Sequence, residues 1–126
     1  MTVLQGALRA QLGWFAAASL YNSLSLVAMA QGQQGYAGDA ATTKSAMFAV
    51  LFFGATTVAG ISGRTLTYRI LAPIALILLL VGGVIKHFLL GPADYASFVS
   101  WVIAIAINTF GVVAFGIGVV ASYRSD

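Results

Sequence analysis

The chain contains no cysteine and no glutamate, and only 7% of its 126 residues are charged. Soluble globular domains carry about 25% charged residues, so this composition excludes a soluble globular protein. The absence of cysteine excludes a disulfide scaffold, a Cys-ligated metal site and a catalytic thiol. A hydrophobic content of 60% excludes a disordered chain, which is poor in apolar residues. A polytopic helical membrane protein remains.

The cations of the chain are few and scattered. The net charge is +3, but a nucleic-acid footprint needs Lys and Arg clustered on one face. We therefore expect no nucleic-acid partner, and a lipid bilayer as the environment. The six cations are Arg9, Lys44, Arg64, Arg69, Lys86 and Arg124.

Four stretches are long and apolar enough to cross a membrane as helices, which takes about 20 residues each. They lie at 12–30, 45–63, 70–90 and 97–121. The connections at 31–44, 64–69 and 91–96 are short, and short connections make neighbouring helices antiparallel. The sequence therefore predicts an all-α, up-down-up-down bundle of four transmembrane helices, forming one integral membrane domain over residues 1–126.

Lys and Arg predict the orientation because they favour cytoplasmic loops. One side of the predicted bundle carries four arginines, whereas the other carries Lys44 and Lys86 together with Asp39 and Asp94. This bias places both termini in the cytoplasm and the protein in the cell (inner) membrane. Six aromatic residues are expected to form interfacial belts, namely Trp14, Tyr36, Tyr68, Tyr95, Trp101 and Tyr123.

An open alternative is that the first span is a cleaved signal peptide. Arg9 would be its basic region, and Ala28-Met29-Ala30 resembles a cleavage site of small residues. The polar triplet at residues 21–23 interrupts the apolar stretch, so we expect the span to be retained.

Small and polar residues recur at heptad spacing, where helices in lipid pack closely. We expect helix packing at Ala18, Ser25, Gly60, Gly63, Gly111 and Gly118. Asn22 and Asn108 are the most polar residues at the middle of the membrane. They are expected to hydrogen-bond neighbouring helices, and the alternative is that they line a substrate path.

Lys86 and His87 are the only ionisable groups within a predicted span apart from tyrosines. They lie in its last turn, where cations complement the helix dipole and a lysine can extend to the headgroups. The alternative is contact with a lipid or quinone headgroup. Arg64 and Arg69 are expected to set topology, and the alternative is binding of anionic lipid headgroups.

The motifs of common catalytic sites are missing. There is no Walker-type loop, GxSxG or HExxH, and the three aspartates lie in loops or at the C-terminus, away from where acid–base catalysis would need them. We expect a protein without enzymatic activity, cofactor or metal.

Two functions are consistent with these features. The first is an accessory or assembly subunit in a homo-oligomer or larger membrane complex. The second is an oligomeric channel or carrier for a small or apolar solute, because a single four-helix chain is expected to leave little room for a cavity. An unfilled polar seam at Asn22 and Asn108 would favour the carrier, and an outward face of small residues would favour the subunit.

In size and four-span layout the chain resembles the small multidrug resistance transporters. That family carries an essential glutamate in its first helix, and this chain has Tyr21-Asn22 in its first span and no glutamate. The resemblance therefore covers the architecture and implies no coupling residue.

Overall fold

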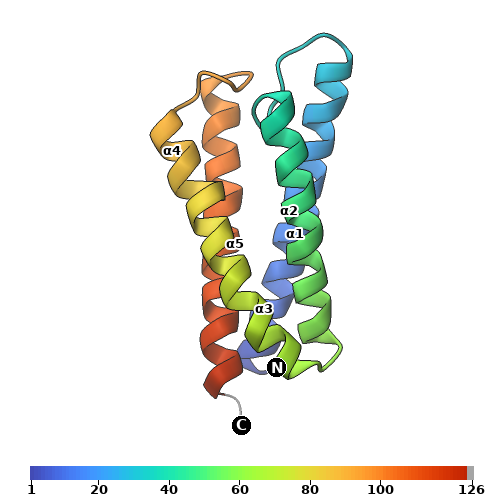
Figure 1. Cartoon of the computed structure of the whole chain (residues 1–126), viewed down its shortest axis with the longest axis vertical. Helices are drawn as coiled ribbons and strands as arrows, with labels where there is room; N and C mark the ends of the chain where they lie inside the picture. Colours follow the sequence, from blue (N-terminus) through green and yellow to red (C-terminus); the bar gives the residue numbers. More distant parts are fainter. Residues whose placement is uncertain (125–126) are drawn as a thin grey trace.

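The computed structural model describes residues 1–124, in which every regular element is a helix. The elements are α1 (Val3–Ala30), α2 (Ala40–Ile61), α3 (Thr65–Leu78), η1 (Leu79–Ile85), α4 (Lys86–Leu90) and α5 (Phe98–Arg124). α3, η1 and α4 follow one another without a break and form one span, so the bundle has four helices long and apolar enough to cross a membrane. The four run up and down in turn (Figure 1). This confirms the predicted all-α membrane bundle.

Three of the four spans begin earlier than the predicted apolar stretches, and polar side chains cap two of them, α1 and α2. α1 starts at Val3 rather than at residue 12, since Thr2 and Gln5 form a reciprocal capping box. α3 starts at Thr65, so the predicted turn at 64–69 is too long and all of it except Arg64 is helical. Gly63, with φ +77°, turns the chain between α2 and α3.

The third span contains a π-helix that the sequence analysis did not predict. η1 runs through seven residues, Leu79–Ile85, and includes Gly82 and Gly83. π-helical turns are rare and are frequently found at functional sites. η1 packs against α5 rather than α2.

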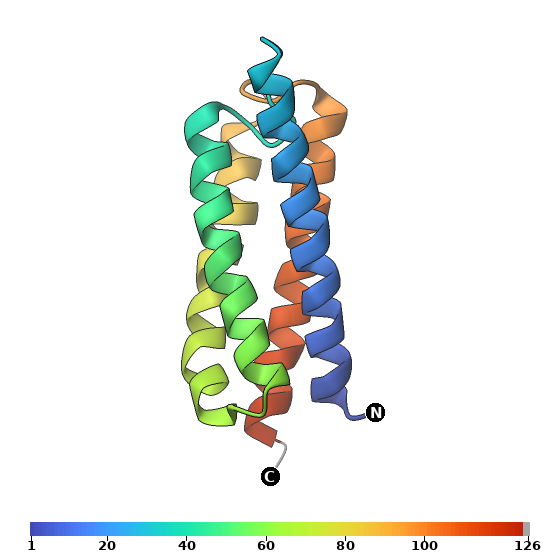
Figure 2. The same cartoon turned by 90° about the vertical axis from the view of Figure 1, so that its right-hand side faces the viewer.

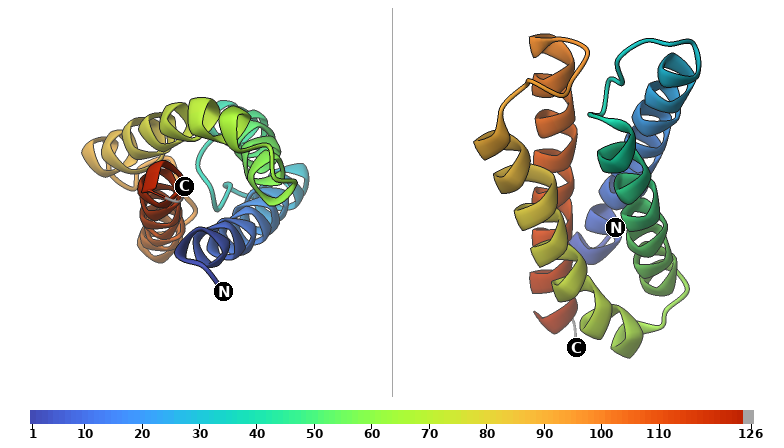
Figure 3. Two further views of the ribbon diagram at one scale, coloured as in Figure 1. Left: turned by 90° about the horizontal axis from the view of Figure 1, so that it is seen from below. Right: turned by 45° about the horizontal axis from the view of Figure 1, so that its top comes forward.

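One end of the bundle, near the two chain termini, is closed by a buried hydrogen-bond network. Gln11 Nε2 donates to the Tyr68 hydroxyl at 2.6 Å, and Thr57 Oγ1 donates to Gln11 Oε1 at 3.0 Å. Gln11 Nε2 also lies 3.4 Å from the carbonyl oxygen of Ala114. The Gln11 side chain therefore links α1 to α2, α3 and α5 at this end of the bundle. The left view of Figure 3 shows this end from below.

The opposite end is wider. There, the pair formed by α1 and α2 diverges from the pair formed by α5 and the η1–α4 segment (Figures 1 and 3). α1 and α5 stay in contact along their length, as Figure 2 also shows from the side. The two loops at this end are joined, because Gln34 Nε2 donates to Ala93 O at 3.2 Å and Ala96 N donates to Gly35 O at 3.1 Å. The divergence therefore creates space beneath connected loops.

Candidate ligand site between the helix pairs

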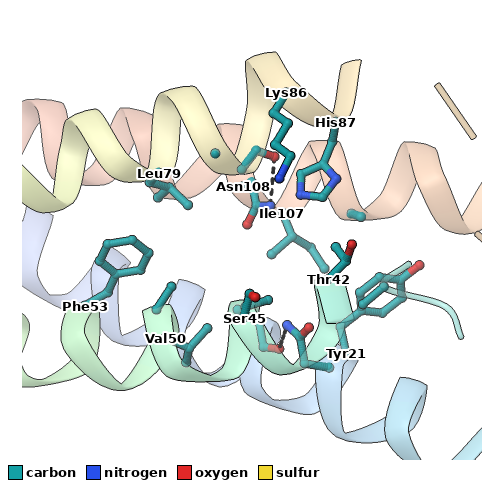
Figure 4. Close-up of a pocket in the computed structure, with 18 of the residues that line it drawn as sticks. Tyr21, Thr42, Ser45, Val50, Phe53, Leu79, Lys86, His87, Ile107 and Asn108 are labelled. Carbon is teal, nitrogen blue, oxygen red and sulfur yellow. Dashed lines mark hydrogen bonds between the residues drawn. The ribbon is translucent and has the colours of Figure 1, made fainter. Parts of the chain in front are cut away.

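A cavity of about 390 Å³ lies between the diverging helix pairs (Figure 4). This volume is within the range of small-molecule sites, and it corrects the expectation that a single chain leaves little room. The reason is that the helices pack closely only at the Gln11 end. The deepest wall is apolar and is lined by Trp14, Ala18, Val50, Phe53, Leu79 and Ile107.

The aromatic part of this wall is rigid. The ring centroids of Trp14 and Phe53 lie 5.3 Å apart, and those of Trp14 and Phe115 lie 5.9 Å apart. Edge-to-face packing of this kind adds to the stability that burial alone provides. The cavity floor is therefore built by the main hydrophobic core of the bundle.

The other end of the cavity is polar. Hydroxyl groups come from α1 and α2, and a cation, an imidazole and an amide come from the facing third span and α5 (Figure 4). Polarity therefore changes along the cavity, from apolar near the middle of the bundle to polar toward the joined loops. The polar lining residues include Tyr21, Thr42, Ser45, Lys86, His87 and Asn108.

The cavity opens sideways, between α2 and the η1–α4 segment. Lining residues on these two elements are exposed, including Ser45 on α2 and Gly82 and Lys86 on the third span, whereas Trp14 and Asn22 on α1 are buried. α2 packs along α1 and α3, and η1 packs along α5. The facing edges of α2 and η1–α4 are thus not packed against each other in the part of the chain that the structure describes.

The two asparagines both line the cavity but make different bonds. Asn108 Nδ2 donates to Gly83 O at 3.0 Å, which joins α5 to η1 as expected for an interhelical hydrogen bond. Asn22 Nδ2 instead donates to Ala18 O, one turn earlier in its own helix, at 2.8 Å. The expected bond from Asn22 to another helix is therefore not formed, because small residues surround it. Its Oδ1 is buried and has no partner among the described residues.

Lys86 lines the cavity instead of pairing with an acid. Figure 4 shows its side chain beside those of His87 and Asn108, directed toward the opposite helices. It forms no ion pair or hydrogen bond with any residue that the structure describes. A cation at the edge of an apolar cavity is a strong electrostatic feature, because the low-dielectric wall screens it weakly.

His87 is held in place by residues of the adjoining segment. The Tyr95 hydroxyl and His87 Nδ1 lie 2.5 Å apart, and Trp101 Nε1 donates to His87 O at 2.9 Å. Burial raises the pKa of Tyr95 to about 12, so the phenol stays protonated and is hydrogen-bonded to Nδ1. Nε2 takes no part in this bond and is left available to a ligand.

Five of the six predicted packing residues lie inside the bundle. Ala18 and Ser25 are buried on α1, and a Cβ added to Gly60, Gly111 or Gly118 would meet a neighbouring side chain at less than 3.0 Å. Gly63 is the exception. It is exposed, a Cβ there would meet no atom within 4 Å, and its positive φ serves the α2–α3 turn. The prediction of helix packing at Gly63 is therefore wrong.

Arg64 and Arg69 are separated by the early start of α3. Arg64 stays exposed in the turn. Arg69 Nε donates to Ser122 O at 2.7 Å, and its guanidinium lies 5.5 Å from the centroid of the Tyr123 ring. Arg69 thus connects α3 to the end of α5.

Three aromatic residues assigned to interfacial belts are buried instead. Trp14 lies in the cavity floor, Tyr68 in the Gln11 network and Tyr95 against His87. Trp14 is deeper than predicted because α1 begins nine residues earlier, at residue 3 instead of 12. One sequence signal could have indicated that this part of α1 is buried: Gln11 lies on the same face of the helix as Ala18 and Asn22.

Comparison with known proteins gives no match: no family model, curated protein or solved structure is significantly similar to the chain. Among residues 1–124, no group of three or more His, Cys, Asp or Glu side chains lies close enough to hold a metal ion.

Proposed function

We propose that this multi-pass membrane protein binds a small amphiphilic molecule in the cavity between its helix pairs, without catalysing a reaction. The observation that supports this most is the side opening between α2 and η1–α4, which leads from the lipid-facing surface to an apolar floor with a polar rim. An amphiphile in a bilayer has the same order of polarity along its length. It can reach the cavity by moving sideways, with its head kept near the membrane surface.

The rim is rich in groups that bind a polar head. Lys86 and His87 are the pair for which a lipid or quinone headgroup was the alternative, and both line the cavity. Asn22 and Asn108 also line it, which is the arrangement expected of a carrier or binding protein. Because the cavity lies in one chain, binding needs no second copy.

The proposed orientation follows from the distribution of charge. The arginine-rich end, with both termini, faces the cytoplasm, and the polar rim lies toward the opposite face of the cell membrane. The amphiphile would then come from the outer leaflet, with its chain pointing toward the middle of the bilayer.

The two tryptophans give a direct test of binding. Trp14 forms the cavity floor, and Trp101 lies outside the cavity lining. In lipid nanodiscs, tetradecanol brominated near the end of its chain should quench Trp14 fluorescence, because bromine quenches at contact distance. Quenching should persist in Trp101→Phe and disappear in Trp14→Phe. If neither this alcohol nor carboxylate and ammonium amphiphiles with the same chain quench Trp14, the proposal is wrong.

A matched pair of glycine variants tests the location. Gly82 lines the cavity and Gly13 lies on the outer face of α1, and a Cβ at either position would meet no atom within 4 Å. Gly82→Leu should fill the opening and abolish quenching, whereas Gly13→Leu should preserve it. Equal quenching in both variants would place the amphiphile outside the cavity.

Assembly as an accessory subunit is the second candidate function. α1 carries small residues on the face turned away from the bundle, at Gly6, Ala10, Gly13 and Ala17, and nothing in the described chain lies within 4 Å of a Cβ at Gly6 or Gly13. Small-residue faces allow close helix packing in lipid. Association with a second copy or a larger complex would be measured by native mass spectrometry from mild detergent, and Gly13→Leu should weaken it whereas Gly82→Leu should not.

A further inference from the structure

Three polar groups that the third span and α5 place at the cavity rim keep bonding capacity after the bundle has packed: the Lys86 ammonium, the His87 imidazole and the Asn108 amide oxygen. They come from adjacent parts of the third span and α5, and Figure 4 shows them together on one side of the cavity. If the cavity binds an amphiphile, as proposed above, these groups determine which head it takes.

The first two groups select for negative charge. Lys86 has no ion pair with a described residue. The carboxylate of Asp39, in the loop above, accepts the Thr42 N–H at 2.7 Å and caps α2, and the charge of Lys86 adds a smaller lowering of the Asp39 pKa without a direct contact. His87 Nδ1 is bonded to the Tyr95 hydroxyl, which leaves Nε2 to donate to an anionic head when the imidazole carries a hydrogen there. Two donors, one of them charged, suit a carboxylate or phosphate oxygen and disfavour a cationic head.

The third group selects for a hydrogen-bond donor. A backbone carbonyl only accepts, so the Asn108 atom facing Gly83 O must be Nδ2. The amide oxygen is therefore left over, and it forms no hydrogen bond within the described chain. In Figure 4 it is directed into the space between the helix pairs. A ligand that places only methylene groups there leaves this acceptor unsatisfied, which is unfavourable in a dry cavity.

The spacing of these groups determines how far apart the anionic group and the hydrogen-bond donor of a bound head should lie. Gly83, which anchors Asn108, precedes Lys86 by three residues, so the two positions lie within one helical turn of each other. We infer that the cavity binds a single-chain amphiphile with an anionic head at Lys86 and His87 and a hydroxyl or N–H group, a few bonds from the acid, that donates to Asn108 Oδ1. A 3-hydroxy carboxylate has this arrangement.

Competition against the brominated tetradecanol tests the inference separately from the proposed function. In nanodiscs containing the wild-type protein, 3-hydroxytetradecanoate should displace the probe at about fivefold lower concentration than tetradecanoate, as expected for one added hydrogen bond. Both should displace it better than tetradecyltrimethylammonium. Equal displacement by the two acids overturns the donor assignment, and equal displacement by acid and ammonium overturns the charge assignment. In both cases quenching by the probe still supports the proposed cavity.

Two lysine variants and one asparagine variant assign the effects to residues. Lys86→Gln should weaken binding of both acids by about tenfold or more and leave the alcohol unaffected. Lys44 is an exposed lysine at the same end of the bundle and does not line the cavity. Lys44→Gln should therefore leave binding of the two acids and the alcohol unchanged. Asn108→Leu should remove the preference for the hydroxy acid. Equal losses in the two lysine variants would show a general surface-charge effect and overturn the assignment to Lys86.

Discussion

Asn22 and Asn108 show how much the role of a residue depends on its immediate neighbours. Both asparagines lie within a membrane-spanning helix, and both line the same cavity. Asn108 faces the exposed carbonyl of Gly83, where the missing Cβ lets the amide approach to 3.0 Å. Asn22 faces small side chains and returns its amide N–H to its own helix. The Asn108 bond joins α5 to η1, whereas the Asn22 bond stays within α1 and leaves Asn22 Oδ1 without a partner among the described residues.

Leucine substitutions should therefore change stability in opposite directions. Asn108→Leu removes an interhelical hydrogen bond and should lower the free energy of unfolding by about 0.6–2 kcal/mol. Asn22→Leu removes an unpartnered buried oxygen, and the Ala18 carbonyl keeps its backbone helix bond, so the ligand-free protein should gain about 1 kcal/mol. Thermal and chemical unfolding in detergent measure both. A loss of stability in Asn22→Leu would show that its oxygen has a partner.

At the scale of the helix, α5 uses its glycines unequally. Gly118 and Gly116 are two residues apart and point in different directions. A Cβ at Gly118 would overlap the Tyr68 hydroxyl and lie 2.5 Å from Gln11 Nε2, whereas a Cβ at Gly116 would meet no atom within 4 Å. Close packing at the terminal end of the bundle thus depends on one of these two glycines.

Alanine substitutions at the two positions should separate packing from helix propensity. Gly118→Ala should displace Tyr68 and Gln11 and lower the free energy of unfolding by about 1–3 kcal/mol. Gly116→Ala should raise it by up to about 1 kcal/mol, because alanine favours a helix over glycine. Chemical unfolding in detergent micelles provides the comparison. Similar destabilisation in both variants would argue against the Gln11 network as the point that holds this end together.

The start of α2 should respond to acid. The Asp39 carboxylate accepts the Thr42 N–H, and this bond lowers the pKa of Asp39 from its ordinary value of 3.8. The cap therefore contributes its full stability above that value and loses it as the pH falls through the lower, folded-state pKa. Asp39→Asn keeps a capping oxygen at every pH. The free energies of unfolding of the wild type and Asp39→Asn should be compared from about pH 6 to about pH 2.5. Their difference should shift in favour of the variant at the acid end. A difference that stays constant with pH would show that the Asp39 cap does not cause the acid sensitivity.

At the scale of the molecule, the bundle is closed at one end by polar side chains and open at the other. The Gln11 network holds four helices together near the termini, and at the wide end Tyr21 Oη reaches the carbonyl of Ser100 on α5 at 2.5 Å. Ser25 and Thr43 link α1 to α2 there, at 3.2 Å. No comparable link among the described residues joins α2 to η1, which leaves that side of the cavity open.

The proposed orientation can be tested because the chain has no cysteine. Ala93 lies in the loop at the wide end, Ser62 lies in the α2–α3 turn, and both are exposed. A membrane-impermeant maleimide added to intact cells should label Ala93→Cys, and it should label Ser62→Cys only after the membrane is permeabilised. The reverse pattern would place the cavity rim on the cytoplasmic side.

Much of the architecture was predictable because it depends on composition along a single segment. Apolar stretches of sufficient length give the four spans, and short polar connections make them antiparallel. The capping box at Thr2 and Gln5 was missed, so the depth of Trp14 was misjudged. η1 was missed because Gly82-Gly83 is compatible with an ordinary helix.

The candidate site was predictable only in its parts. Lys86, His87, Asn22 and Asn108 stand out because polar groups in a membrane span are unfavourable unless something binds them. Their gathering around one cavity depends on which helices diverge, and that is decided by contacts between spans rather than within one.

The amino-acid order alone was sufficient for the number of spans, their alternating direction and the identity of the polar residues within them, since each of these follows from local transfer of side chains and backbone into lipid. The cavity, its side opening and the free oxygen of Asn108 required the packed chain. They arise from contacts between residues far apart in sequence, such as Gln11 with Tyr68 and Asn108 with Gly83, and no local pattern encodes how closely two helices approach.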